Sequence, residues 1–314
     1  MKRGLRRLAD LGRGEIEWIL KTSAALKKDR RAPNAPKPLE GRSLGMIFNK
    51  PSTRTRVSFE VGMVQLGGHA VVLSADQIQM SRGETVADSA RIFSRYLDGL
   101  AIRTFRQEDV DELSRVAQIP VINMLTDMHH PCQALADLFT IQEKLGSVRG
   151  VKMAYVGDGN NVANSLIEAA GIMGFHLNVA TPRGYEPDEI ILAAARDTAK
   201  SSGGAINLYN DPAEAVRSTG VVYTDTWVSM GQDGEAAKRL KDFEGWQVDS
   251  KLVGLAARDA IVMHCLPAHR GEEISAEVLD GPQSVVWDQA ENRLHTQKAA
   301  LILLLNPAAA AQYP

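Results

Sequence analysis

Residues 52–56 gather three hydroxyl groups and two guanidinium groups in five consecutive positions. They follow an apolar run that predicts a strand, and they precede Val57, Val61 and Val64, whose spacing predicts a helix. The cluster thus stands at a helix N-terminus, where unpaired backbone N–H groups and the helix dipole attract anions. An N-cap needs one hydroxyl, such as that of Ser52, so the whole cluster predicts a phosphate-binding turn.

Other polar side chains stand where predicted elements begin or end. Arg103 closes an apolar run, and the carboxyl ends of parallel strands are where open α/β sheets hold their ligands. His130 precedes Pro131 at the expected start of a helix, and Gln133 on the next turn would reach the same side. Arg56, by contrast, could face away from the site and form a structural ion pair.

Short apolar runs alternate with longer stretches of helical period, a pattern typical of parallel α/β architecture. The first half offers four strands and the second half six, which predicts two domains, each with a central parallel sheet flanked by helices. We expect the division in the helix that begins near Pro131. The expected strands are LGMIFN, HAVVLS, GLAIRT and PVINML, followed by VKMAYVG, HLNVAT, AINLY, GVVYTD, AIVMHCLP and SVVWDQ.

Composition points to small-molecule partners. The chain has 314 residues, 44% of them apolar, so it can bury a full core, and its length fits one large or two ordinary domains. Its 36 basic and 38 acidic residues nearly balance without long runs of one sign, so neither a nucleic-acid nor a membrane surface is indicated. The N-terminus lacks a signal-peptide core, no run approaches the ~20 apolar residues of a membrane span, and the two cysteines suggest no disulfide framework. We expect a cytoplasmic protein.

Five stretches resemble, in order, the aspartate and ornithine carbamoyltransferase family. They are STRTR at 52–56, AIRTF at 101–105, HHPCQALAD at 129–137, DTWVSMG at 225–231 and HCLPAHRGEEI at 264–274. The last two resemble the ornithine branch, because the aspartate enzymes carry a different, arginine-bearing substrate loop. The match extends over nearly the whole chain.

The resemblance implies a reaction and a division of labour. The carbamoyl group of carbamoyl phosphate would pass to the δ-amine of L-ornithine, which gives L-citrulline and phosphate, with no cofactor and no metal. A carbamoyl-phosphate-binding domain is expected at 1–133, with a terminal helix at about 291–314 packing back on it. The ornithine-binding domain is expected at 134–290.

The resemblance also implies the site. Thr55, Arg103 and His130 would donate hydrogen bonds to the carbonyl oxygen as it becomes negative, and Asp225 and Cys265 would orient the attacking amine. The expected contacts of carbamoyl phosphate are Ser52, Thr53, Arg54, Thr55, Gln79, Arg103, His130, Gln133, Cys265, Leu266 and Arg293. Those of ornithine are Asn161, Asp225, Ser229 and Met230. Gln79 lies in a segment resembling the family loop that reaches a neighbouring subunit, which implies a homotrimer with sites at subunit interfaces.

Several alternatives stay open from the residues alone. A sister enzyme could carbamoylate putrescine or an N-acylornithine, and a non-catalytic homologue could keep only the phosphate site. Cys265 could act as a nucleophile with His264, although adjacent strand residues point to opposite faces. A zinc site could be assembled from His129, His130, Cys132, His264, Cys265 and His269, but the spacings fit no standard ligand pair well. Gly157 and Gly159 imitate a dinucleotide fingerprint that lacks its third glycine and its acidic residue.

Overall fold

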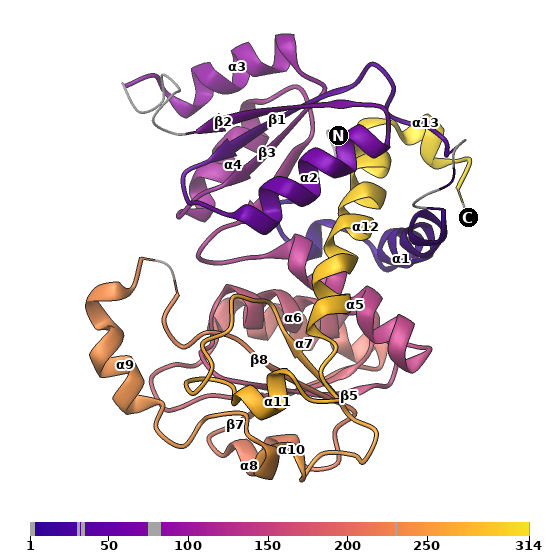
Figure 1. The fold of residues 1–314 in the computed structure, drawn as a ribbon. Helices are drawn as coiled ribbons and strands as arrows, with labels where there is room; N and C mark the ends of the chain where they lie inside the picture. The colour runs from indigo at the N-terminus through magenta and orange to yellow at the C-terminus, as the bar shows by residue number, and fades with distance from the viewer. Residues whose placement is uncertain (1–3, 30–31, 33–34, 75–82, 230, 314) are drawn as a thin grey trace. The chain divides into compact units, whose positions relative to one another are not determined.

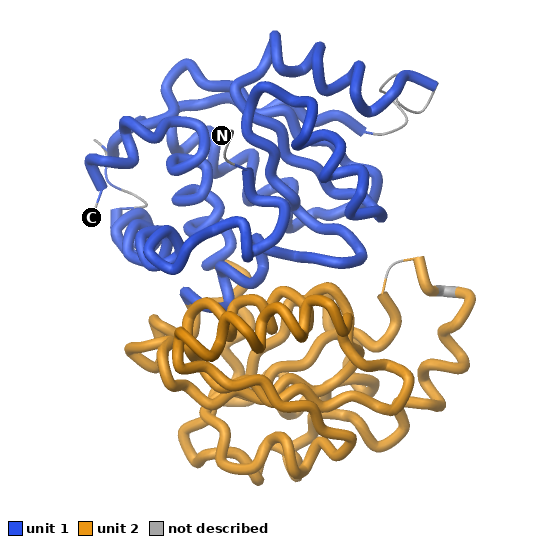
Figure 2. Tube along the Cα trace, turned by 180° about the vertical axis from the view of Figure 1, so that it is seen from behind, with its two compact units in different colours: residues 1–139, 292–314 blue, residues 140–291 orange. Residues whose placement is uncertain are grey.

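The computed structural model describes the chain except for residues 1–3, 30–31, 33–34, 75–82, 230 and 314. It consists of two compact units, residues 1–139 with 292–314, and residues 140–291 (Figure 2). Each unit holds one parallel sheet with helices around it, so the predicted α/β class is confirmed. The units divide at residue 139, inside helix α5 (Pro131–Leu145), where the sequence prediction places the division at 133.

The sheet of unit 1 has the order β2-β1-β3-β4, and all neighbouring strands are parallel. From β1 the chain moves to β2 on one side, while β3 pairs with the other side of β1. The direction of winding therefore changes between β1 and β3, so a ligand site is expected at the carboxyl ends of these two strands. The strands are β1 (Ser43–Phe48), β2 (His69–Ser74), β3 (Gly99–Arg103) and β4 (Val121–Leu125).

The helices of unit 1 cover both faces of this sheet (Figure 1). Right-handed crossovers place α2, which joins β1 to β2, on the face opposite α3 and α4. A Cβ at Gly62 of α2 would lie 3.3 Å from the Lys298 side chain, so α2 packs closely on α12. The helices are η1 (Leu8–Asp10), α1 (Arg13–Lys28), α2 (Thr53–Gln65), α3 (Val86–Tyr96), α4 (Gln107–Val116), the first part of α5, the last part of α12 (Val286–Leu305) and α13 (Pro307–Ala310).

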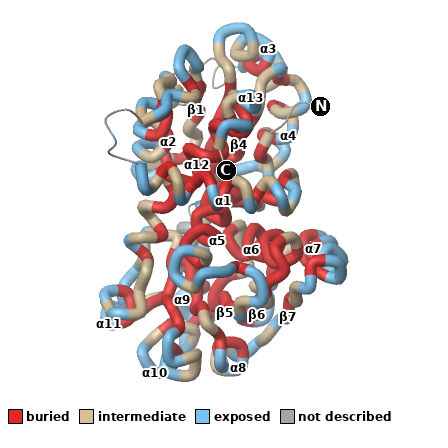
Figure 3. The backbone as a smooth tube through the Cα atoms, turned by 90° about the vertical axis from the view of Figure 1, so that its right-hand side faces the viewer, coloured by how far each residue is buried: buried red, intermediate tan, exposed pale blue. Residues whose placement is uncertain are grey.

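Helix α2 turns an unexpected face to its own core. Phe59 and Met63 are buried, whereas Val57, Val61 and Val64 are exposed by 50%, 39% and 65%. The valine spacing correctly predicts a helix, but the helix shows this apolar stripe on its outward face, in line with the exposed stretches of α2 in Figure 3. Burial on the other face comes from the aromatic ring, the thioether and the close approach at Gly62.

The sheet of unit 2 has the order β7-β6-β5-β8-β9, again wholly parallel. Here the winding changes direction between β5 and β8, so a second ligand site is expected at their carboxyl ends. The strands are β5 (Lys152–Val156), β6 (His176–Ala180), β7 (Ala205–Tyr209), β8 (Val221–Thr224) and β9 (Ile261–His264).

The predicted sixth strand of this sheet, SVVWDQ at 284–289, is wrong. Ser284 makes an isolated bridge to Val262, with one backbone hydrogen bond in each direction across it, and Val286 then begins α12. The apolar run is too short to continue a ladder, and Asp288 in the first helical turn favours the helix through the dipole. Nine of the ten expected strands are present.

Helix α6 (Asn161–Met173), which follows the turn after β5, packs tightly within unit 2. It is buried almost throughout, and a Cβ at Gly171 would lie 2.7 Å from the carbonyl oxygen of Ala195, so α6 and α7 pack backbone against backbone. The other helices of unit 2 are α7 (Glu189–Ser202), α8 (Pro212–Val216), η4 (Asp233–Glu235), α9 (Ala236–Asp242), α10 (Ser250–Val253) and α11 (Ala276–Leu279), beside α6 (Asn161–Met173). Among the described residues, no helix combines the length and apolarity needed to cross a bilayer.

Candidate active site

The turn between β1 and α2 places residues 52–56 at the start of a helix, as the sequence predicts. Ser52 is the N-cap, and its Oγ accepts a hydrogen bond from the Thr55 amide at 3.3 Å. Thr53 and Arg54 form the exposed first turn, whose amides have no partner within an α-helix. Arg56 faces away and pairs with Glu60 at 3.5 Å. The ordinary capping role of Ser52 therefore coexists with an open helix terminus bearing hydroxyl and guanidinium groups.

Behind this turn, one buried guanidinium joins residues that are far apart in sequence. Arg293 of α12 donates to Thr55 Oγ1 at 2.7 Å and to Gln133 Oε1 at 3.1 Å. Gln133 in turn donates to Asp137 Oδ1 at 2.9 Å. These contacts fix the side chains of Thr55 and Gln133, two of the residues expected to bind carbamoyl phosphate, without any ligand.

His130 sits in a field of positive charge. Its pKa lies well below the usual value, mainly because the imidazole is buried. The guanidiniums of Arg293, Arg103 and Arg54 lower this pKa further, which means that all three lie near one point. The imidazole is therefore neutral at physiological pH and can donate a hydrogen bond without carrying charge.

Arg103 approaches His130 from the carboxyl end of β3, beside β1, where the winding of the sheet changes direction. It is the last residue of β3, it is buried, and its carbonyl accepts from the Asn49 amide at 2.9 Å beside the end of β1. A cation is costly to bury unless it is compensated. Three guanidiniums around a neutral imidazole define a site whose best complement is a dianion.

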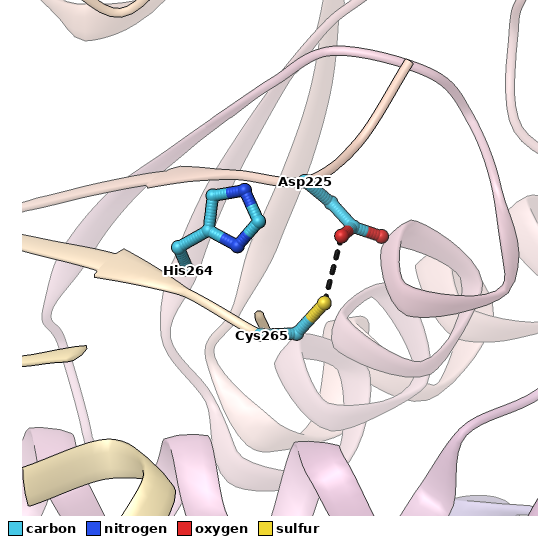
Figure 4. A group of neighbouring side chains, drawn as sticks. All are labelled: Asp225, His264 and Cys265. Carbon is cyan, nitrogen blue, oxygen red and sulfur yellow. Dashed lines mark hydrogen bonds between the residues drawn. The ribbon is translucent and has the colours of Figure 1, made fainter. Parts of the chain in front are cut away.

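Unit 2 presents a second polar group at its own switch point (Figure 4). Cys265, which follows β9, donates its thiol to Asp225 Oδ1 at 2.7 Å, and Asn160 donates to Asp225 Oδ2 at 2.7 Å. Asn160 also caps α6, because its Oδ1 accepts from the amides of Val162 and Ala163. The buried carboxylate is thus held by two donors in one orientation, suited to receive a cationic or protic group.

His264 faces other partners. Its Nε2 lies 3.0 Å from Glu273 Oε1, and its Nδ1 accepts from the Leu266 amide at 2.8 Å. Both ring nitrogens are engaged, so His264 has none left to activate Cys265. Ligand atoms of Asp225, His264 and Cys265 do lie within 4.8 Å of one another, but a metal there would have to displace one of these hydrogen bonds.

Cys132 is chemically inert in the fold. It is buried in α5 and donates to the carbonyl of Asn123 at 3.4 Å. Burial raises its pKa to about 12, so the thiol is protonated at neutral pH and is not a nucleophile. Among the described residues, the groups whose ligand atoms lie close enough to share a metal ion do not include Cys132. The sequence option of a zinc site that uses Cys132 has no support in this geometry.

The remaining expected ligands of ornithine fall on two segments of unit 2. Asn161 begins α6 beside the Asp225 cluster, and Ser229 donates its amide to Gln232 Oε1 at 2.9 Å. Met230, and Gln79 from the carbamoyl-phosphate set, lie outside the described residues.

Several supporting residues escape sequence reasoning. Arg239 of α9 donates to Asp158 Oδ2 at 2.9 Å and to the Trp227 carbonyl at 3.0 Å, and so ties the segment before Ser229 to the turn after β5. Asn160 could have been found, because an asparagine between a glycine turn and a helix is an N-cap signal. Arg239 carries no such signal, since its partners are distant in sequence.

The fold and the two polar groups are those of a two-domain α/β protein with a helix terminus suited to an anion. Family models for aspartate/ornithine carbamoyltransferase match both parts: the carbamoyl-P binding domain over residues 3–143 and the Asp/Orn binding domain over residues 149–304. The chain belongs to the aspartate/ornithine carbamoyltransferase family.

Individual relatives agree over almost their full length. The chain is 54% identical to ornithine carbamoyltransferase from Pyrococcus abyssi, over 95% of this chain and 94% of that protein. Among solved structures, ornithine carbamoyltransferase from Pyrococcus furiosus superposes with a TM-score of 0.93 at 53% identity, over 96% and 97% of the two chains. Anabolic ornithine carbamoyltransferase from Campylobacter jejuni gives a TM-score of 0.92 at 41% identity, over 98% and 100%.

The neutral state of His130 predicts a pH dependence of stability. The pKa of His130 in the folded state lies below the unfolded value of ~6.5, so below that pH the unfolded chain takes up a proton that the folded chain does not. The free energy of unfolding is therefore highest above pH ~6.5 and falls as the pH drops toward the folded-state pKa. Within this window the free energy of unfolding should decline by up to about 1.4 kcal/mol per pH unit more than in His130→Gln. Urea unfolding of both proteins from pH 8 to pH 5, without phosphate, measures the difference. Parallel pH profiles would mean that His130 protonates normally in the fold.

Proposed function

We propose that the chain transfers the carbamoyl group of carbamoyl phosphate to the δ-amine of L-ornithine, giving L-citrulline and phosphate. The chain is an enzyme, a carbamoyltransferase. The observation that carries the proposal is the neutral imidazole of His130 among Arg54, Arg103 and Arg293, directly beside the α2 terminus. This combination offers cations for a phosphate and an uncharged donor for a carbonyl oxygen.

The chemistry assigns a task to each donor in unit 1. Attack on the carbamoyl carbon forms the C–N bond and pushes negative charge onto the carbonyl oxygen, and the C–O bond to phosphate then breaks. We assign Thr55, Arg103 and His130 to stabilise that oxyanion, which gains more from fixed donors than the ground-state carbonyl does. Ser52 to Arg54, with the first-turn amides of α2, would hold the departing phosphate.

The amine must lose a proton, since a free primary ammonium has a pKa of ~10.4. Cys265 and Asn160 orient the carboxylate of Asp225. We assign this carboxylate to accept a hydrogen bond from the δ-ammonium group and so to orient the amine as it loses its proton. Asn161, Ser229 and Met230 would bind the α-amino and α-carboxylate groups. Carbamoyl transfer neither consumes nor supplies electrons, so the reaction as written requires no redox cofactor.

Sister reactions on putrescine or an N-acylornithine would use the same phosphate site with a different amine pocket. The Ser-Met-Gly motif at 229–231 and the ornithine carbamoyltransferases among the relatives favour ornithine. The relatives from Pyrococcus furiosus and Campylobacter jejuni that are named as anabolic support a role in arginine biosynthesis. The two free cysteines are consistent with the reducing cytoplasm. Rescue of an arginine auxotroph that lacks citrulline synthesis tests the metabolic assignment.

A steady-state assay tests the reaction and its phosphate site together. Purified protein given carbamoyl phosphate should form citrulline from ornithine and little product from putrescine or N-acetylornithine. Arg54→Ala should reduce kcat/KM for carbamoyl phosphate about 100-fold, as loss of a charged transition-state contact does. Arg115→Ala, which removes an exposed arginine of α4, should leave it within about twofold. Unchanged turnover in Arg54→Ala would refute the phosphate assignment, and preference for another amine would refute the acceptor.

We further propose a homotrimer in which a neighbouring subunit supplies Gln79. Support comes from the exposed stripe of Val57, Val61 and Val64 on α2, next to the phosphate turn. Apolar stripes on an outward helix face commonly mark protein contacts, and burying each valine would contribute roughly 1.5 kcal/mol.

Substitution in this stripe should dissociate the assembly. We expect wild-type protein to sediment as a trimer and Val57→Glu/Val64→Glu to sediment as smaller species with reduced citrulline formation. Ile190→Glu is the matched control, because Ile190 of α7 is 81% exposed and lies in unit 2. A monomeric wild type, or a double variant that remains trimeric, would contradict the proposed interface.

A further inference from the structure

Lys50 is a buried cation to which neither the sequence motifs nor the proposed chemistry assigns a role. It stands two residues before Ser52, and only 3% of its side chain is exposed. Its Nζ lies 2.5 Å from Asp127 Oδ1 and 4.0 Å from the centroid of the Phe105 ring. An ammonium group in this setting has exchanged water for one carboxylate and one aromatic face.

The two partners belong to the other loops at the same edge of the sheet. Phe105 follows Arg103 by two positions after β3, and Asp127 precedes His130 by three positions after β4. Lys50 itself follows β1. One ammonium group therefore joins three loops: the one that leads into the phosphate turn, the one that follows Arg103 and the one that leads to His130.

Backbone contacts make this edge a connected unit. The Asn49 amide donates to the Arg103 carbonyl at 2.9 Å, and the Asp127 amide donates to the Phe105 carbonyl at 2.8 Å. Asn49 Nδ2 also donates to Thr104 Oγ1 at 2.9 Å. Those bonds align neighbouring loops in pairs, whereas Lys50, which belongs to the first loop, contacts side chains of both other loops.

We propose that Lys50 is a positioning residue, which sets the relative placement of the phosphate turn, Arg103 and His130 through its contacts with Asp127 and Phe105. The inference rests on the proposed carbamoyl-phosphate site in unit 1. Donors that act on one small ligand must be placed within about 0.5 Å, and misplacement by 1 Å can cost about 100-fold in rate. A brace among three loops supplies that placement.

Two other roles for Lys50 give different results on substitution. If Lys50 acted only through its positive charge near the anion, removing the Asp127 carboxylate would strengthen phosphate binding, because an anion beside the site would be lost. If the pair served only general stability, both variants would unfold more easily but would bind phosphate normally. The positioning role predicts weaker phosphate binding in both variants.

The test compares Lys50→Met and Asp127→Ala by isothermal titration with inorganic phosphate, and by kcat and KM for carbamoyl phosphate. Both variants should bind phosphate at least about tenfold more weakly, while Lys50→Arg should recover most of the affinity. The double variant should lose little more than either single one, because the two residues act as one contact. Thermal unfolding without ligand shows separately whether the fold is intact.

Lys144→Met is the matched control, since Lys144 pairs with Asp288 at the same 2.5 Å within unit 2. It should leave phosphate affinity within about twofold. Tighter or unchanged phosphate binding in Asp127→Ala, or failure of Lys50→Arg to restore binding, would overturn the positioning role. Failure of the wild-type protein to bind phosphate would instead refute the proposed function, which separates the two failures.

Discussion

The positive charge concentrated at the carboxyl edge of the first sheet is the constraint on which the rest of the site depends. Arg103 and Arg293 are buried there, and burial of the His130 imidazole, together with the charges of Arg293, Arg103 and Arg54, lowers its pKa and keeps it neutral. Like charges gathered in a protected place repel one another and cost solvation free energy. Hydrogen bonds from Arg293 to Thr55 and Gln133 offset part of that cost, and a bound dianion would offset much more. An apo protein of this kind is therefore prepared for its ligand.

Both units use the same device to place their polar groups. In each parallel sheet the winding changes direction next to a central strand, and the loops at that point carry the residues of interest. The first sheet presents a helix terminus and guanidiniums, which suit an anion. The second presents Asp225 with its thiol and amide donors, which suits an amine. The difference in chemistry between the units lies in the side chains rather than in the topology.

The sequence predicts the parts of the fold that are governed by local pattern. Nine strands and the helix after the phosphate turn follow from periodicity and turn signals. Local pattern also misleads. The segment SVVWDQ has the composition of a strand, but it forms a single β-bridge at Ser284 and then enters helix α12 at Val286. The valines of α2 show another limit, because spacing reveals a stripe and not the direction it faces.

The site is predictable only as far as motifs mark it. Thr55, Gln133 and Arg293 come from separate stretches, and Arg293 is 238 positions from Thr55, so no local rule could place their side chains in contact. Lys50 and Arg239 are invisible at the sequence level for the same reason: their partners lie in loops that approach only after the sheets form. Supporting contacts of this kind depend on tertiary structure, whereas the capping signal at Ser52 does not.

A crystal structure with phosphonoacetamide, a stable analogue of carbamoyl phosphate, tests the central claim most directly. Its phosphonate oxygens should lie within hydrogen-bonding distance of the first-turn amides of α2 and of Arg54 and Arg103, with the amide carbonyl facing His130 and Thr55. An empty α2 terminus, with the analogue bound at another place, would contradict the assignment of this charged edge as the phosphate site.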